Sequence, residues 1–259
     1  MKRIKKYDEI SNLISAQLKK GMITNCFLSK DEFEYYIREK RLFYISYDGG
    51  LLIFIKQCGY YNLKYYINDL SCNIKLPKFS RIVIEIVGKD RKSLEKSVEF
   101  LKKNKFNVVL NRLRFSCVNP PINEKLDIKN ISKLKLKDYK KTIKILRKNY
   151  DKYTGCIPTK DKLKIDIEKG NFYCYKEDNK ILGILHICSK ANGTEMRHLV
   201  VLKRHRGKNI SKCLIEKYLL DTASGTKQVW TSTNNKVAQN LFEKFGYEPD
   251  GFVSTVLMN

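Results

Sequence analysis

The sequence predicts an α/β (α+β) protein with two tandem domains, each a mixed, largely antiparallel sheet flanked by helices. The chain has 259 residues, which exceeds the usual size of one compact domain. In both halves, segments rich in β-branched and aromatic residues alternate with amphipathic helical segments, as in sheets covered by helices. A faint internal repeat relates the halves, because residues 101–106 (LKKNKF) align with residues 242–247 (FEKFGY).

The first half, residues 1–120, is expected to form one domain. Its second helix begins at a capping box of Ser29 and Glu32, and the turn Asp48-Gly49-Gly50 predicts a hairpin. The segments RIVIEIV, RKSLEKSVEFLKKNKF and NVVLNRLRFSCV predict a strand, a helix and a strand. NPPINEK, residues 119–125, has two prolines and no periodicity, which is typical of a linker.

The second half, residues 127–259, is expected to form the other domain. Two helices come first, the shorter of them closed by Gly170. Three strands follow as an antiparallel meander, NFYCYK, ILGILHICS and TEMRHLVVL, separated by the turns EDNK and KANG. The remaining segments predict a helix, a strand, a helix and a last strand: GKNISKCLIEKYLL, QVWTST, NKVAQNLFEKFGY and GFVSTVLM.

The composition excludes several classes of protein. The chain is 42% hydrophobic, too apolar for disorder, and no apolar run approaches the ~20 residues that span a bilayer. The N-terminus lacks the apolar core of a signal peptide, so we expect a cytoplasmic protein without membrane contact. The eight cysteines are scattered singly, which indicates buried thiols and no metal site.

The net charge of +25 has two interpretations. The charge is diffuse, and lysine accompanies abundant Ile, Asn and Tyr, as codon bias toward A and T produces. The alternative is an acidic partner, whether RNA, an acidic carrier protein or a polyanionic substrate.

Residues 199–211 (LVVLKRHRGKNIS) carry the sharpest chemical signal. An apolar strand enters a basic turn with Gly207, and the turn opens onto an amphipathic helix. The first N–H groups of a helix lack internal partners and lie at the positive end of its dipole, so they bind anions well. Gly207 allows close approach to the main chain, and Arg206 and Lys208 add positive charge.

A second motif follows about 24 residues later, Asn235-x-x-Ala238-x-x-Leu241-Phe242-Glu243-Lys244-Phe245-Gly246-Tyr247. Together the two segments resemble the GNAT superfamily of acyl-CoA-dependent N-acyltransferases. The first motif of that family has the form R/Q-x-x-G-x-G/A, and the second reads much like N-x-x-A-x-x-L-Y-E-K-x-G-F. Their order, spacing and flanking strands agree over roughly residues 127–259. The resemblance therefore implies two tandem GNAT-like domains, the second of which binds acetyl-CoA.

The resemblance implies a set of cofactor-binding residues. The strand would pair through its backbone with the pantetheine arm, and the turn would wrap the pyrophosphate with main-chain amides. Asn235 would hydrogen-bond the pantetheine arm, and Ala238 would keep its helix close to the cofactor. The complete set is Leu199, Val200, Val201, Arg206, Gly207, Lys208, Asn209, Ile210, Ser211, Asn235 and Ala238.

Two residues of the turn depart from the family pattern. Asn209 stands where the family usually has glycine, and Ser211 where it has glycine or alanine. Asn tolerates a left-handed backbone and Ser is small, so both are compatible with the turn.

The resemblance also suggests catalytic residues. Glu195 lies where the histone-acetylating branch keeps its general base; the alternative is an exposed strand carboxylate without a role. Histidine ordinarily titrates near neutral pH, which makes His198 a second candidate; the alternative is a partly buried histidine without a role. Strand alternation predicts that His198 faces away from Glu195. Phe242 replaces a tyrosine thought to protonate the thiolate, which leaves water or Tyr247 for that task. The oxyanion donor would be a main-chain N–H around Val200.

The first half has neither motif, since Leu94 and Ser97 stand where the asparagine and alanine would align. It is expected to support or cover the acceptor site without a cofactor of its own. The expected function is transfer of an acetyl group from acetyl-CoA to a primary amine on a small molecule or peptide. The alternatives are a non-catalytic acyl-CoA-binding regulatory module and a nucleic-acid-associated transferase that uses aminoacyl-tRNA.

Overall fold

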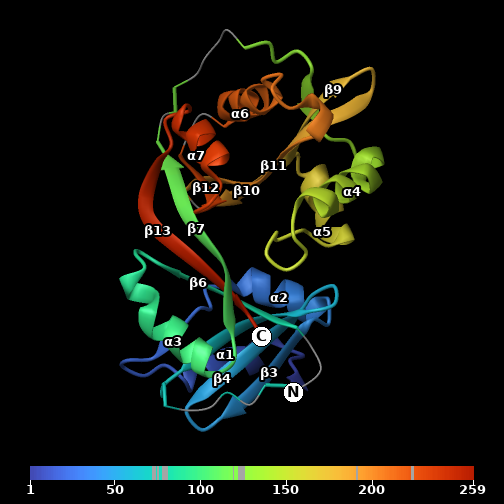
Figure 1. Cartoon of the computed structure of the whole chain (residues 1–259). Coiled ribbons are helices and arrows are strands. Elements are labelled where there is room, and N and C mark those ends of the chain that lie inside the picture. The colour runs from blue at the N-terminus through green and yellow to red at the C-terminus, as the bar shows by residue number, and fades with distance from the viewer. Residues whose placement is uncertain are drawn as a thin grey trace. The chain divides into compact units, whose positions relative to one another are not determined.

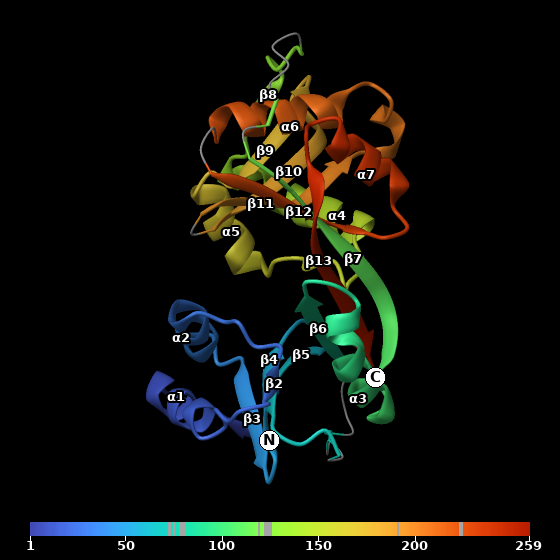
Figure 2. The same ribbon diagram turned by 90° about the vertical axis from the view of Figure 1, so that its left-hand side faces the viewer.

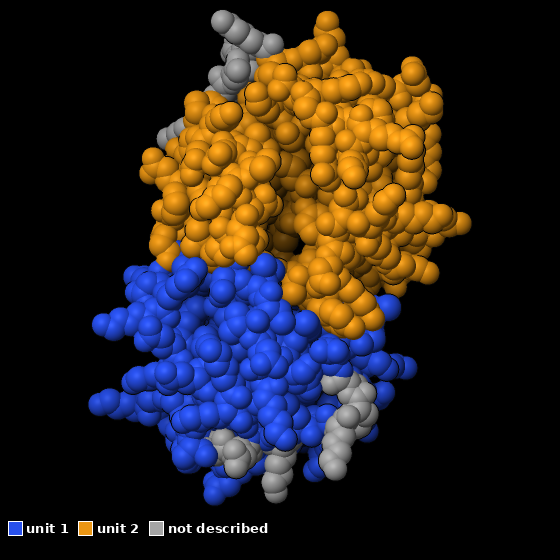
Figure 3. All heavy atoms as spheres, viewed as in Figure 1, with its two compact units in different colours: residues 1–111, 252–259 blue, residues 112–251 orange. Residues whose placement is uncertain are grey.

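The computed structural model describes the chain except residues 72, 73, 75, 78–80, 119, 122–125, 191, 223 and 224. Both halves of the sequence contain strands and helices (Figure 1). The chain divides into two compact units, unit 1 with residues 1–111 and 252–259, and unit 2 with residues 112–251 (Figure 3). Both have the mixed, helix-flanked sheet that the sequence predicts. In the part of the chain that is described, no helix is long and apolar enough to cross a bilayer.

Unit 1 has the strand order β1-β3-β4-β5-β6-β13, with β2 beside β5. The β5–β6 pair is parallel, and the other pairs are antiparallel. The elements are β1 (Lys2–Arg3), α1 (Tyr7–Ser15), β2 (Ile23–Thr24), α2 (Lys30–Arg38), β3 (Leu42–Tyr47), β4 (Gly50–Lys56), β5 (Tyr61–Ile67), β6 (Ile82–Gly88), the 3-10 turn Lys92–Leu94, α3 (Glu95–Lys103) and β7 (Asn107–Cys117), which continues into unit 2.

Local sequence signals explain where two elements of unit 1 begin and end. The Ser29 hydroxyl accepts the Glu32 N–H at 3.3 Å, and the Glu32 carboxylate accepts the Ser29 N–H at 2.9 Å, so the predicted capping box is confirmed. The predicted hairpin is also confirmed, because Tyr47 pairs with Gly50 across a two-residue turn in which Gly49 has φ of +97°.

The core of unit 1 lies on both faces of the sheet. Ile10 and Phe33 of α1 and α2 pack on one face, and Phe100 and Leu101 of α3 pack on the other. Residues 51–55 of β4 alternate between the two clusters and are all buried. Burial on both sides explains why this strand is an unbroken apolar run.

The parallel strands β5 and β6 separate after two paired positions, and Asn25 fills the resulting gap. Its Nδ2 donates to the carbonyls of Leu63 on β5 (3.1 Å) and Glu85 on β6 (3.0 Å), while its Oδ1 accepts the Tyr65 N–H at 2.9 Å. The preceding Thr24 belongs to β2, which pairs directly with β5. The edge of β5 is therefore covered by the loop between α1 and α2.

Unit 2 has the strand order β7-β12-β11-β10-β9-β8, in which β11 and β12 are parallel and the other pairs antiparallel. The predicted meander is confirmed. The elements are β8 (Ile131–Lys133), the 3-10 turn Leu136–Asp138, α4 (Tyr139–Asn149), α5 (Lys160–Glu168), β9 (Phe172–Glu177), β10 (Lys180–Lys190), β11 (Gly193–Val201), the 3-10 turn Lys203–His205, α6 (Ile210–Asp221), β12 (Thr226–Ser232), α7 (Lys236–Glu243) and β13 (Glu248–Met258).

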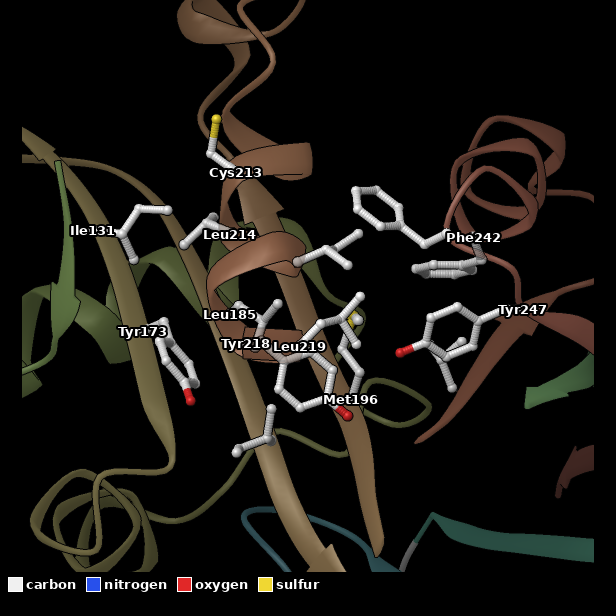
Figure 4. Packing of buried hydrophobic residues seen from close by; sticks show 14 of the residues in the cluster. Ile131, Tyr173, Leu185, Met196, Cys213, Leu214, Tyr218, Leu219, Phe242 and Tyr247 are labelled. Atoms are coloured by element: carbon white, nitrogen blue, oxygen red, sulfur yellow. The ribbon is translucent and has the colours of Figure 1, made fainter. Parts of the chain in front are cut away.

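Two clusters form the core of unit 2, one on each face of the sheet. Helices α6 and α7 cover one face, where Leu214, Phe242 and Tyr247 pack around Met196 (Figure 4). Helices α4 and α5 cover the other face. Figures 1 and 2 show these helix pairs on opposite sides of β10 and β11.

A β-bulge at Arg197 interrupts the regular alternation of β11. The adjacent residues His186 and Ile187 of β10 lie opposite His198 and Met196, so Arg197 is an extra residue on β11. Directly paired residues point their side chains to the same face of the sheet, and adjacent residues of β10 point to opposite faces. The side chains of His198 and Met196 therefore lie on opposite faces.

The bulge overturns one expectation from the sequence. Glu195 pairs with Cys188, which is two residues from His186 and so on the same face. Glu195 and His198 therefore share the face covered by α4 and α5, and the prediction that they face apart is wrong. Counting alternate residues fails here because the bulge inserts one residue between them.

Strands β7 and β13 each belong to both units. Residues 112–117 of β7 pair with β12 in unit 2, and residues 253–258 of β13 pair with β6 in unit 1. The boundaries of the compact units thus fall inside strands, whereas the sequence suggests a boundary between residues 120 and 127. Residues 119 and 122–125 of the expected linker lie outside the described residues.

A buried chain of polar groups joins α5, β10, β11 and the α4–α5 loop. His198 Nε2 lies 2.8 Å from the Gly155 carbonyl, so this nitrogen carries the proton. Neutral His198 then accepts at Nδ1 from His186 Nδ1, 2.9 Å away, and His186 Nε2 faces Asp166 Oδ2 at 3.5 Å. Burial lowers the pKa of both histidines, and that of His198 to about 3.

We predict that unit 2 loses stability as the pH falls below about 6.5, the ordinary histidine pKa. Below this pH the imidazole of His198 is protonated in the unfolded chain but stays neutral in the folded protein until the pH is much lower. Each such histidine therefore lowers the free energy of unfolding by up to about 1.4 kcal/mol per pH unit. Urea unfolding followed by the fluorescence of Trp230, the single tryptophan, measures this dependence. His198→Gln should have a shallower dependence, and an unchanged slope in this variant would contradict the assignment.

Candidate functional site

The separation of β11 from β12 creates the candidate site. The two parallel strands pair only over residues 193–196 of β11 and then diverge. Leu202 N–H bonds to Leu182 of β10, and successive residues of a strand point their polar groups to opposite edges. Leu199 and Val201 therefore direct their N–H and C=O groups toward the open side.

The oxyanion donor was expected to be a main-chain N–H around Val200. The main chain of Val200 itself points toward β10, where it pairs with Ile184. The main-chain N–H that faces the open edge next to it belongs to Leu199. Of the three neighbouring strand residues Leu199, Val200 and Val201, the first and the last thus turn their main-chain polar groups toward the open edge.

The Tyr150 hydroxyl occupies both polar groups of Leu199. It accepts the Leu199 N–H at 2.9 Å and lies 3.2 Å from the Leu199 carbonyl, to which it donates. Burial raises the pKa of Tyr150 to about 12, so the phenol keeps its proton at neutral pH. Tyr150 follows the last residue of α4 and begins the loop that leads to α5.

The turn from β11 to α6 has the backbone of an anion-binding loop. Gly207 has φ of +83°, and Asn209 has φ of +57° in the left-handed region, where asparagine is well tolerated. Asn209 is the N-cap of α6 and makes no side-chain capping bond, so the first N–H groups of the helix point toward the turn. The cations Arg206 and Lys208 flank it, and Arg206 Nε donates to the Val201 carbonyl at 3.3 Å.

Helix α6 begins close to the sheet. A methyl group placed on Gly183 of β10 would lie 2.9 Å from Ile210 Cγ2 and 3.1 Å from Leu214 Cδ1. Ile210 is buried, and Ser211 follows it in the first turn. The glycine therefore lets the positive end of the helix lie against the strands that form the candidate site.

Asn235 caps helix α7. Its Oδ1 accepts the Ala238 N–H at 3.2 Å, and Ala238 packs against the core cluster of α6 and α7. The cap uses only the oxygen of the amide. The Nδ2 group is thus the part of Asn235 that can donate to a ligand.

Glu195 is buried and held by two cations. It is 8% exposed, and its oxygens lie 2.6 Å from Arg197 Nε and 3.2 Å from Lys190 Nζ. The alternative of an exposed strand carboxylate is therefore wrong. A base at this position has to take up a proton while it remains within an ion-pair network.

The other residues considered for catalysis lie in buried surroundings. Tyr247 is 0% exposed in the cluster of α6 and α7, and burial strongly raises the pKa of its hydroxyl. Phe242 lies beside Tyr247 (Figure 4), with ring centroids 6.0 Å apart, and its ring centroid is 6.4 Å from that of Phe115. His198 has both ring nitrogens engaged. These side chains serve the core, and the open edge of β11 is formed by main-chain groups.

Sequence reasoning missed three residues that shape the site. Tyr150 was expected only on the apolar face of a helix, while His186 and Arg197 had no expected role. Nothing in a single sequence pairs His186 with His198 or places a bulge at Arg197, because both follow from the register of β10 and β11. Among the described residues, no group of His, Cys, Asp and Glu side chains is arranged to hold a metal ion.

Comparison with known proteins identifies the domain that contains the candidate site. Residues 168–249 match the family model described as acetyltransferase (GNAT) domain. No curated protein matches the chain by sequence.

Solved structures share the fold at low sequence identity. A GNAT-family acetyltransferase from Colwellia psychrerythraea has a TM-score of 0.58 and 14% identity, covering 99% of this chain and 98% of its own. A GCN5-related N-acetyltransferase from Sphaerobacter thermophilus has a TM-score of 0.60 and 10% identity, covering 100% and 94%. A tandem GNAT protein from the clavulanic acid biosynthesis pathway has a TM-score of 0.50 and 9% identity, covering 82% and 78%.

The family match covers the separated strands, the basic turn, α6 and α7, which are the elements that build the candidate site. The structural likeness extends the same fold over the whole chain. Residues 168–249, which lie in unit 2, thus form a GNAT acetyltransferase domain, and the whole chain shares its fold with solved GNAT proteins.

Proposed function

We propose that unit 2 binds acetyl-CoA and transfers its acetyl group to a primary amine. The observation that carries the proposal is the divergence of β11 and β12, which leaves main-chain N–H and C=O groups on an edge beside a helix N-terminus. An extended arm with amide groups can add to such an edge as a strand would. A diphosphate suits the N-terminus of α6 with its neighbouring cations.

The residues of the turn fit the coenzyme. Arg206, Gly207, Lys208, Asn209, Ile210 and Ser211 would hold the pyrophosphate, and the edge of β11 with Asn235 Nδ2 would hold the pantetheine arm. When bound, acetyl-CoA supplies a thioester carbonyl carbon open to attack and a thiolate leaving group. The Leu199 N–H would stabilise the carbonyl oxygen, where negative charge develops.

Glu195 is proposed as the group that takes the proton from the attacking amine, directly or through water. It shares a face of the sheet with His198, on the side covered by the α4–α5 loop. An acceptor would approach from that side, because the Glu195 carboxylate lies there. The acceptor itself is a small molecule or a peptide amine.

A second candidate function is a non-catalytic module that binds acyl-CoA and regulates another process. Two observations favour it. Phe242 carries no hydroxyl that could protonate a thiolate, and Glu195 is held by Arg197 and Lys190. Coenzyme binding without thiol release over a broad panel of amines would support this function over the first.

Gly207→Glu should weaken coenzyme A binding by at least about 100-fold. The carboxylate would enter the pyrophosphate position, and charge-assisted hydrogen bonds there are worth about 1.5–3 kcal/mol each. Titration calorimetry measures the loss. Gly207→Asn is the control, because asparagine accepts the positive φ without adding charge, and it should lose much less affinity. Undiminished binding by Gly207→Glu would exclude the proposed pyrophosphate site.

One coenzyme A should bind per chain. In unit 1 the gap between β5 and β6 is filled by Asn25, and the described residues between these strands form no helix that could hold a phosphate. Native mass spectrometry and calorimetry give the stoichiometry. A value of two, or binding to a second class of sites that survives in Gly207→Glu, would show that unit 1 also binds the coenzyme.

Glu195→Gln should lower turnover by about 10²- to 10⁴-fold, the usual worth of general-base assistance, while the coenzyme Kd stays nearly constant. The loss should shrink at high pH, where more of the amine is already neutral. Steady-state rates and calorimetry measure the two effects. Glu177→Gln, a carboxylate on β9, is the control and should leave turnover unchanged. Full activity of Glu195→Gln at every pH would mean that another group removes the proton.

A further inference from the structure

The α4–α5 loop, residues 150–159, is fastened to β11 at two consecutive residues. The Tyr150 hydroxyl bonds to Leu199, and the Gly155 carbonyl accepts from His198 Nε2. A third contact holds the loop from β7, where Arg112 donates to the Thr154 carbonyl. Only the first of these contacts uses the open edge of β11.

The Tyr150 hydroxyl bonds to both main-chain polar groups of Leu199 at the open edge of β11. The oxygen accepts one N–H and the proton is given to one C=O, both from Leu199. Buried backbone groups need such partners when no neighbouring strand provides them. The Tyr150 oxygen therefore stands where another acceptor of the Leu199 N–H would stand.

In unit 1, a buried asparagine side chain bonds to the separated strands β5 and β6. There Asn25 bonds to both separated strands and is 3% exposed, and β2 before it belongs to the sheet. Removing it would break several hydrogen bonds and a strand pair together. In unit 2 a single phenol hydroxyl bonds to the edge, at Leu199 alone.

We infer that Tyr150 is a displaceable latch of the acyl-CoA site, which rests on the proposed function. In the free protein its hydroxyl holds the main chain of Leu199 and fastens the start of the α4–α5 loop. The thioester arm of the coenzyme replaces the hydroxyl at Leu199, and release of Tyr150 frees the start of the loop on the side where the acceptor enters, while the contacts at Thr154 and Gly155 remain. Coenzyme binding thus precedes opening of the acceptor side.

Tyr150→Phe tests the latch through binding to the full-length chain. Removing the competing hydroxyl leaves Leu199 without its partner in the free protein, so coenzyme A should bind about 2- to 10-fold more tightly, which corresponds to one hydrogen bond. Tyr175→Phe is the matched control, because its hydroxyl bonds to Asn130 and Glu177 on the surface, and it should leave the affinity unchanged.

Hydrogen exchange gives a second measurement that does not depend on activity. In free Tyr150→Phe the Leu199 amide should exchange faster than in the wild type, and coenzyme A should restore its protection. Equal exchange of this amide in the two free proteins would overturn the latch, as would coenzyme affinity that falls or stays equal in Tyr150→Phe. Absence of any coenzyme binding by the wild type would overturn the proposed function and the latch together, so the two failures are distinguishable.

Discussion

The divergence of two parallel strands is the constraint on which the rest of this structure depends. When β11 and β12 separate after residue 196, the peptide groups of β11 that would have joined a ladder need other partners. The same problem arises in unit 1, where β5 and β6 pair at only two positions. A phenol hydroxyl meets the need in unit 2, and an asparagine with a short strand meets it in unit 1. In both units the partner comes from the loop between the first two long helices.

The difference between the two solutions would account for the proposed binding of the coenzyme in unit 2 alone. In unit 1, β2 and the buried Asn25 fill the gap between β5 and β6, which stabilises the unit and closes the edge of β5. Unit 2 keeps its edge available and adds a basic turn with a helix N-terminus after it. The shared strands β7 and β13 tie the two folds together, since each unit needs a segment from the other half of the sequence to complete its sheet.

The sequence predicted elements wherever a local signal was sufficient. The hairpin at Gly49, the capping box at Ser29 and the left-handed residue Asn209 follow from the backbone preferences of a few neighbouring residues. Two kinds of feature needed tertiary pairing. The β-bulge at Arg197 depends on the register with β10, so the relation of Glu195 to His198 was reversed. The pairing of β7 with β12 and of β13 with β6 depends on which sheet edge is open to each strand, and no local sequence pattern predicts that.

The bulge also gives Glu195 its electrostatic setting. The extra residue in β11 is Arg197, and its guanidinium is the nearer of the two cations that hold the carboxylate. With Lys190, the three side chains carry a net charge of +1 (−1 + 1 + 1). A neighbouring positive charge disfavours an ammonium ion and favours an anion. In the proposed reaction this setting favours the neutral form of the acceptor amine, which is the nucleophile, and also favours the departing thiolate. The cations that hold Glu195 would thus assist the proposed reaction at both the amine and the thiolate, and they would do so without a hydroxyl at position 242.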